Sequence, residues 1–155
     1  MSRASQGNLP DARATALKWL SRRDYSRLEL ELKLARKLFS AQTVAAELDR
    51  LEEEGYLSDR RFAEMLVRSR VSGGYGPVKI RHELRQKGVA SAICEQLLAE
   101  LAQDWAALAT QVQKSHFGAS PPGDFRAKSK RARYLQARGF EHDHIRAAVG
   151  LSETD

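Results

Sequence analysis

The sequence is poor in cysteine and lacks long apolar runs, and each of these shortages excludes a class of protein. Its one cysteine, Cys94, excludes an internal disulfide framework and a zinc site built from several cysteines. No apolar run approaches the roughly 18–20 residues of a membrane span, and residues 1–11 are polar, unlike a secretory signal. We therefore expect a cytoplasmic protein with no membrane segment.

Strand-forming residues and proline are also scarce. Valine and isoleucine together occur 10 times, against 22 alanines and 19 leucines. Strands favour β-branched residues, whereas alanine, leucine and the long charged residues favour helices. Between residues 12 and 114, Pro77 is the only proline. Because hydrophobic residues make up 42% of the chain, a packed core is expected, and the sequence predicts an all-α fold.

One segment, residues 27–37, suggests a strand because leucine alternates with charged residues. We favour a helix, since the alternating apolar residues are neither β-branched nor aromatic. Ser26 and Glu29 also form the S-x-x-E capping box that marks a helix start. The predicted buried stripe consists of three leucines one helical turn apart: Leu30, Leu34 and Leu38.

A pattern recurs at intervals of about fifty residues. Tyr25-Ser26 precedes the helix just described, and Tyr75-Gly76-Pro77 precedes a second one with proline at its first position. In both copies an aromatic residue before the cap and an apolar residue at the fourth helical position can form a hydrophobic staple. Gly88-Val89 closes the second copy, and Gly139-Phe140 closes a third in which Arg131 replaces the apolar staple residue.

The chain is therefore predicted to contain three three-helix repeats, at residues 12–57, 58–102 and 103–151. Each repeat has a lead-in helix, a basic middle helix and a lead-out helix. The expected lead-in and lead-out helices span residues 14–22, 41–54, 59–71, 91–101, 104–114 and 143–149. A loop is expected at residues 116–123, and flexible segments at residues 1–11 and 152–155.

The 26 lysines and arginines exceed the 20 acidic residues and give a net charge of +6. In a helix-turn-helix the last helix reads the major groove, but here the last helices are acidic or nearly uncharged. The cations gather on the middle helices, which suits phosphate or an acidic protein surface, although a merely solvated helix face is the alternative. In the third repeat no acid interrupts the predicted contact residues: Arg126, Lys128, Lys130, Arg131 and Arg133.

Catalytic and metal-binding patterns are weak. His142 and His144 are two residues apart and so lie on different faces of a helix, and Cys94 falls in an apolar pattern. No phosphate-binding glycine loop is present. We expect a protein that is not an enzyme and that uses no cofactor or metal.

The segment from Arg68 to Gly88, with Gly74-Tyr75-Gly76-Pro77 at its centre, resembles the RecX family of bacterial recombination regulators. The joint Gly55-Tyr56-Leu57 and the late motif Arg138-Gly139-Phe140 resemble that family too, and the match covers about residues 14–149. Arg131 departs from the family pattern, which has an apolar residue there.

The resemblance implies tandem helix-turn-helix-like repeats in an elongated, curved array that binds along the groove of the RecA–single-stranded-DNA filament. It implies an inhibitor of ATP hydrolysis, strand exchange and co-protease activity, with a role in DNA repair and the SOS response. We expect the protein to be a monomer. Single- and double-stranded DNA are further candidate partners. The predicted partner-binding residues of the second repeat are Arg68, Arg70, Tyr75, Lys79, Arg81, Arg85 and Lys87. The alternatives are direct DNA binding without the recombinase and a purely structural adaptor.

Overall fold

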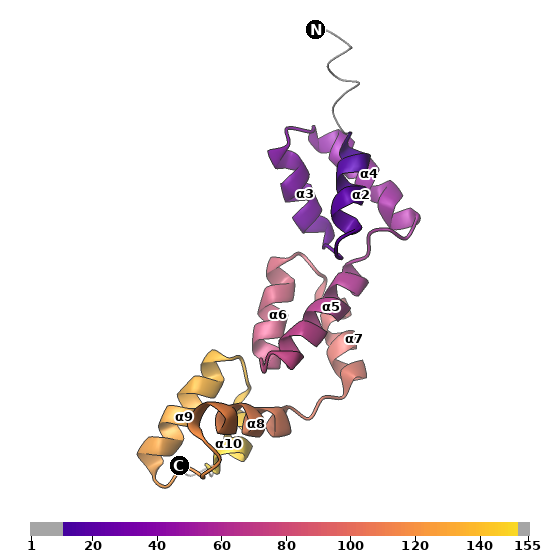
Figure 1. Cartoon of the computed structure of the whole chain (residues 1–155). Coiled ribbons are helices and arrows are strands. Elements are labelled where there is room, and N and C mark those ends of the chain that lie inside the picture. The colour runs from indigo at the N-terminus through magenta and orange to yellow at the C-terminus, as the bar shows by residue number, and fades with distance from the viewer. Residues whose placement is uncertain (1–10, 152–155) are drawn as a thin grey trace, which may run out of the picture. The chain divides into compact units, whose positions relative to one another are not determined.

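The computed structural model describes residues 11–151, which contain nine α-helices and no strand (Figure 1). No helix in that range is long and apolar enough to cross a membrane. The prediction of an all-α fold is confirmed, including the helical state of the alternating leucine segment. In chain order the helices are α2 (Ala12–Leu20), α3 (Arg27–Arg36), α4 (Ala41–Glu53), α5 (Asp59–Ser72), α6 (Pro77–Gln86), α7 (Ser91–Leu101), α8 (Trp105–Phe117), α9 (Phe125–Ala137) and α10 (His142–Val149).

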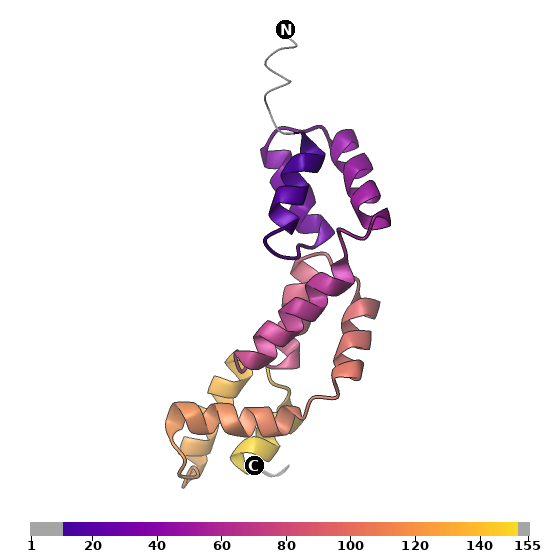
Figure 2. The ribbon, with the colours of Figure 1, turned by 45° about the vertical axis from the view of Figure 1, so that its right-hand side comes forward.

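The described chain divides into two compact units. The first contains the residues up to Met65 together with Lys87–Val89, and the second contains Leu66–Gln86 and the residues from Ala90 onward. In the first unit α2, α3 and α4 pack against one another around an apolar core, as both ribbon views show (Figures 1 and 2). In the second unit α10 packs against α8 and α9, and α6 packs against α7.

Local signals in the sequence fix most helix starts. The Ser26 hydroxyl accepts a hydrogen bond from the Glu29 N–H, while the Glu29 carboxylate accepts one from the Ser26 N–H, so the predicted capping box is confirmed. Ser58 accepts from the Arg61 N–H at the start of α5, and Pro77 is the first residue of α6. The Ser26, Glu29 and Ser58 side chains pair helix-end N–H groups that would otherwise lack partners, whereas Pro77 has no N–H group to pair.

The predicted buried stripe of the first middle helix is wrong at its last member. Leu30 and Leu34 are fully buried, but Leu38 is 92% exposed and has a φ of 66°. The helix ends at Arg36, and Leu38 occupies the left-handed position that reverses the chain after a helix. Gly88 and Gly139, with φ values of 77° and 90°, occupy the corresponding positions after α6 and α9.

The third repeat has its own apolar core, in which Leu135 and Phe140 are buried. The loop expected at residues 116–123 begins later, at Gly118, because α8 continues to Phe117. The rings of His116 and Phe117 pack against Tyr134 of α9, which accounts for the additional helical turn. At the N-terminus, Asp11 caps α2 rather than belonging to a flexible segment. The flexibility predicted for residues 1–10 and 152–155 concerns residues outside those described.

Candidate interaction surface

The second and third repeats meet within the second compact unit through their backbones. The Gly76 N–H donates to the Arg138 carbonyl at 2.8 Å, and the Val78 N–H donates to the Gly139 carbonyl at 2.9 Å. A Cβ atom on Gly76 would lie 2.3 Å from the Gly139 oxygen, and one on Gly139 would lie 2.5 Å from the Lys79 Cβ. The glycines of these two motifs therefore permit docking of one repeat on the next, in addition to their turn geometry.

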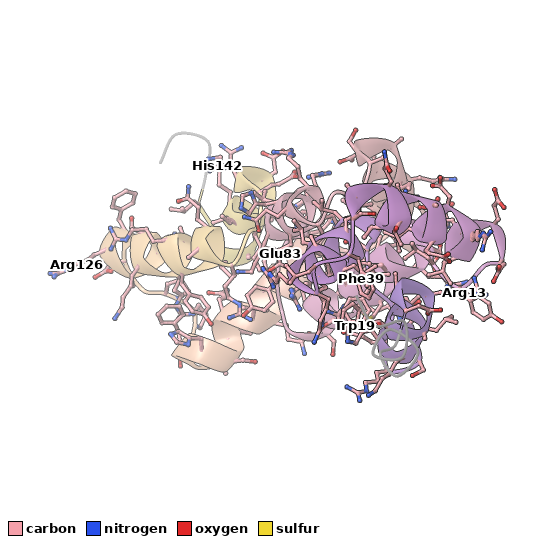
Figure 3. The ribbon with its side chains drawn as sticks, turned by 90° about the horizontal axis from the view of Figure 1, so that it is seen from above. Arg13, Trp19, Phe39, Glu83, Arg126 and His142 are labelled. Atoms are coloured by element: carbon pink, nitrogen blue, oxygen red, sulfur yellow. The ribbon has the colours of Figure 1, made fainter. Side chains whose placement is uncertain are left out.

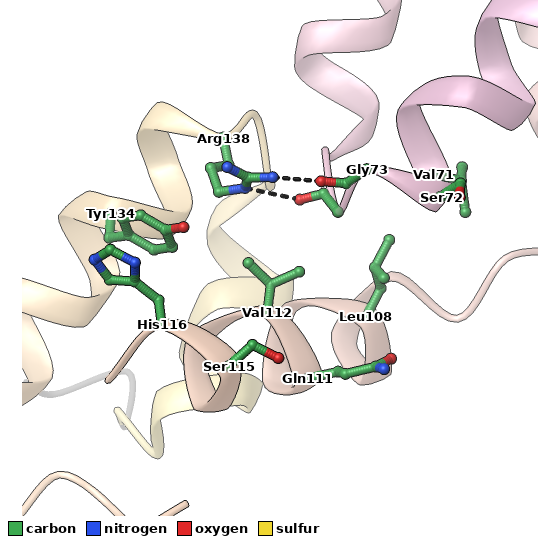
Figure 4. A pocket seen from close by; sticks show the side chains of 11 residues that line it. Val71, Ser72, Gly73, Leu108, Gln111, Val112, Ser115, His116, Tyr134 and Arg138 are labelled. Carbon is green, nitrogen blue, oxygen red and sulfur yellow. Dashed lines mark hydrogen bonds between the residues drawn. The ribbon is translucent and has the colours of Figure 1, made fainter. Parts of the chain in front are cut away.

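The Arg138 side chain closes this joint from the third repeat. Its guanidinium donates to the carbonyls of Gly73 and Gly74 (Figure 4). The same guanidinium lies 4.1 Å from the ring centre of Tyr75. A cavity of about 510 Å³ adjoins it, lined in part by Tyr134. The cavity lining contains no carboxylate and no cysteine. The joint thus combines hydrogen bonds and cation–π contacts.

Arg81, predicted as a partner contact, is engaged inside the second unit. Its guanidinium pairs with Glu95 of α7 at 2.7 Å and with Glu141, the residue before α10, at 2.8 Å. The hydrogen bonds from Arg81 to Glu95 and Glu141 raise the pKa of this guanidinium above its ordinary value. Arg81 therefore connects the second repeat to the third.

Four more of the predicted contacts in the second repeat are also occupied. Arg70 pairs with Glu83 at 2.5 Å in the second unit, and Lys87 lies 3.4 Å from the Glu29 carboxylate in the first unit. Tyr75 is half-buried, and the Lys79 ammonium lies 4.8 Å from its ring centre. The exposed members of the predicted set without an ion pair among residues 11–151 are Arg68 and Arg85.

In the third repeat, Arg131 is 8% exposed and does not belong to the outer basic face. Its guanidinium donates to the Gln113 side-chain oxygen at 3.1 Å and to the Ser120 carbonyl at 2.8 Å. Gln113 in turn donates to the Ala148 carbonyl of α10. Arg131 stands where α6 has the buried Ile80, so a polar network replaces an apolar staple at this position. The expected surface role of Arg131 is corrected accordingly.

Most of the other cations of α9 lie on its outer face. Arg126, Lys130 and Arg133, which we call the α9 cation surface, are exposed and have no carboxylate partner among the described residues. Their spacing of four and three residues places them on one face of the helix. Figure 3 shows Arg126 pointing away from the ribbon. Lys128 is half-buried and donates to the Gly150 carbonyl at 3.1 Å.

Cys94 is buried, and burial raises the pKa of its thiol, which disfavours the reactive thiolate. The described residues contain no cluster of three or more histidine, cysteine or acidic side chains able to hold a metal.

All three repeats match known protein domains. Residues 12–51 match the first three-helix domain of RecX, residues 58–98 the second and residues 102–149 the third. The chain belongs to the RecX family. The regulatory protein RecX of Halorhodospira halophila is 45% identical over 143 residues, covering 92% of this chain and 89% of that protein. RecX of Chromohalobacter salexigens is 43% identical, covering 88% and 90% of the two chains.

Solved RecX structures share the fold. The crystal structure of RecX from Lactobacillus salivarius superposes with a TM-score of 0.76 at 23% identity and covers 90% of this chain and 92% of that one. A second RecX crystal structure gives a TM-score of 0.78 at 22% identity, covering 91% and 72%. The prediction of three tandem three-helix domains is confirmed, and the relatives named regulatory proteins indicate a regulator.

Proposed function

We propose that this RecX-family regulator binds the RecA–single-stranded-DNA filament along its groove and inhibits ATP hydrolysis, strand exchange and co-protease activity. The observation that carries the proposal is the α9 cation surface in a chain of the RecX family. Its three cations form a row and have no carboxylate partner among residues 11–151, so their charges can meet phosphate or carboxylate groups of a partner.

Tandem repeats suit a polymeric partner. Each exposed ion pair contributes only about 0.2–1 kcal/mol, so one contact alone would give weak binding. When successive repeats engage successive subunits, later contacts form within the same complex and the weak contacts reinforce one another. Arg68 and Arg85 of the second repeat are proposed to add to the α9 cation surface in this way.

The proposal is tested by adding the protein to RecA assembled on single-stranded DNA and measuring ATP hydrolysis. We expect hydrolysis to fall with increasing protein, and the triple variant R126Q/K130Q/R133Q to inhibit less. As a control outside the α9 cation surface, R50Q removes one exposed arginine, which lies 3.6 Å from Glu47 on its own helix. Undiminished hydrolysis at saturating protein would refute the proposal.

The alternative is direct DNA binding without the recombinase, and the acid-free run of α9 cations favours it too. Each phosphate contact lowers log affinity by about 0.7–0.9 per unit of log salt concentration. Fluorescence anisotropy with labelled oligonucleotides, without RecA, measures this slope. Tight binding to bare DNA, with a slope that the triple variant flattens and with RecA hydrolysis unaffected, would favour the alternative.

A further inference from the structure

A groove in the first repeat is unrelated to the α9 cation surface. It lies beside α2 and the turn that joins α3 to α4, with a volume of about 420 Å³. Trp19 and Phe39, both labelled in Figure 3, supply its aromatic surface. The remaining lining residues are Ala14, Thr15, Lys18, Arg22 and Lys37.

The apolar part of the groove is held in place by the fold. Trp19 and Phe39 are only partly buried, and both pack against the core of the first repeat. The Lys33 ammonium lies 4.5 Å from the ring centre of Trp19 and so fixes one side of the indole. A ligand entering the groove would therefore meet aromatic surface that is already ordered.

The polar part of the groove carries one sign of charge. Lys18, Arg22 and Lys37 are exposed, and none forms an ion pair with a carboxylate among residues 11–151. The lining contains no aspartate or glutamate. The groove is therefore complementary to an anionic ligand that also has apolar parts.

Leu38 is a second, independent observation beside this groove. It lies in the sequence between the lining residues Lys37 and Phe39, is 92% exposed, and has a φ of 66°. The equivalent turns after α6 and α9 use glycine, which adopts this conformation without strain. The Leu38 backbone forms the turn, but its solvated side chain packs against nothing in the repeat and is available as an apolar contact point for a partner.

We propose that this groove, together with Leu38, binds an acidic peptide segment that carries apolar side chains, supplied by a partner protein. The apolar side chains would contact Trp19, Phe39 and Leu38, and the carboxylates would pair with the surrounding cations. A nucleic-acid strand fits less well, because an exposed aliphatic side chain offers a phosphate backbone no attraction. The proposal concerns a different surface from the one assigned to the filament and does not depend on it.

The fluorescence of Trp19 can be used to detect binding in the groove. The chain has two tryptophans, so the W105F variant leaves Trp19 as the only one. The probes are a glutamate-rich peptide carrying leucines, the same peptide with serine at each leucine, and oligothymidylate. We expect the leucine peptide to change Trp19 fluorescence, and the serine peptide to bind at least about tenfold more weakly, as the loss of one buried apolar side chain predicts.

Two further variants of the full chain, both in the W105F background, keep the test decisive. K18Q/R22Q/K37Q should weaken binding of the leucine peptide by about tenfold or more, whereas R126Q/K130Q/R133Q removes the same charge and should leave it unchanged. L38G should weaken binding about threefold while raising the thermal midpoint, so that unfolding cannot explain the loss.

Three outcomes would overturn the proposal. Equal binding of the leucine and serine peptides would show attraction by charge alone. Binding of oligothymidylate in place of the leucine peptide would make the groove a nucleic-acid site. Unchanged binding by K18Q/R22Q/K37Q would place the peptide elsewhere. Because no recombinase is present, these outcomes are separate from any failure of the filament proposal.

Discussion

The middle helices α6 and α9 are both rich in arginine and lysine, yet their cations have different surroundings. Arg81 of α6 pairs with two carboxylates, whereas Arg126, Lys130 and Arg133 of α9 have none among the described residues. The acids that neutralise Arg81 come from other parts of the chain, and Glu141 is 60 positions away. A count of positive residues in a helix therefore does not reveal how many are available to a partner.

The two helices nevertheless share a packing plan, which a pair of core truncations tests. Leu84 of α6 and Leu135 of α9 are both fully buried at equivalent positions. We expect L84A and L135A each to lower the free energy of unfolding by about 2–5 kcal/mol, measured by urea denaturation. A negligible loss of unfolding free energy in either variant would contradict the structural equivalence of the two helices.

The cations of α9 are themselves unequal. Arg131 is buried, and its removal would leave the Gln113 oxygen and the Ser120 carbonyl short of a donor. We expect R131A to lower the free energy of unfolding by about 1–3 kcal/mol. R133A, which removes an exposed cation from the same helix, should change it by no more than about 0.5 kcal/mol. Equal effects in urea denaturation would contradict the assignment of one arginine to the core and the other to the surface.

The salt bridge between Arg81 and Glu141 is expected to contribute less to the free energy of unfolding than Arg131 does, since the Arg81 side chain is 35% exposed. A double-mutant cycle with R81A and E141A should give a coupling energy of about 0.2–1 kcal/mol that declines in high salt. R85A with E141A provides the control, because Arg85 is exposed and unpaired among the described residues. Coupling in the control cycle alone would show that the bridge is misassigned.

Glu29 provides the test with the smallest expected effect. Although burial alone would raise the pKa of this carboxyl, hydrogen bonds from Arg23 and the Ser26 N–H and the nearby Lys87 hold it below its ordinary value of 4.5. A lowered native pKa stabilises the fold above the unfolded-state value, and this stability is lost as pH falls through the native pKa.

We therefore expect the difference in stability between the wild type and E29Q to shrink as pH falls below about 4.5. Glutamine can retain the capping hydrogen bond, so the variant isolates the charge. E53Q, which changes an exposed acid on α4, is the control. Thermal unfolding across this pH range gives the measurement, and a constant difference between wild type and E29Q would contradict the expectation.

Much of the fold could be predicted because its signals are local. The Ser26 capping box, Pro77 at a helix start and glycine after α6 and α9 mark helix ends without knowledge of the tertiary structure. At Leu38 the helical periodicity of leucine was misleading, although alignment with Gly88, fifty positions on, indicated a turn.

The site was less predictable than the fold. Arg131 was assigned to the surface from its charge, but its alignment with the buried Ile80 pointed to the core. The pairing of Arg81 with Glu141 depends on how α10 and α6 are brought together by the Gly76–Arg138 backbone contact, which no local pattern specifies. Charge type can be read from a sequence, whereas the availability of a charge depends on tertiary structure.

The most direct test of the account compares two triple variants that remove the same charge, R126Q/K130Q/R133Q and R70Q/R81Q/K87Q, as inhibitors of ATP hydrolysis by RecA on single-stranded DNA. The assay is run at a temperature at which circular dichroism shows both variants folded. We predict that the first variant loses most of its inhibition, because its cations are available to the filament. The second should retain inhibition, because its cations are held by the protein's own carboxylates. Loss of inhibition by the second variant with retention by the first would contradict the account.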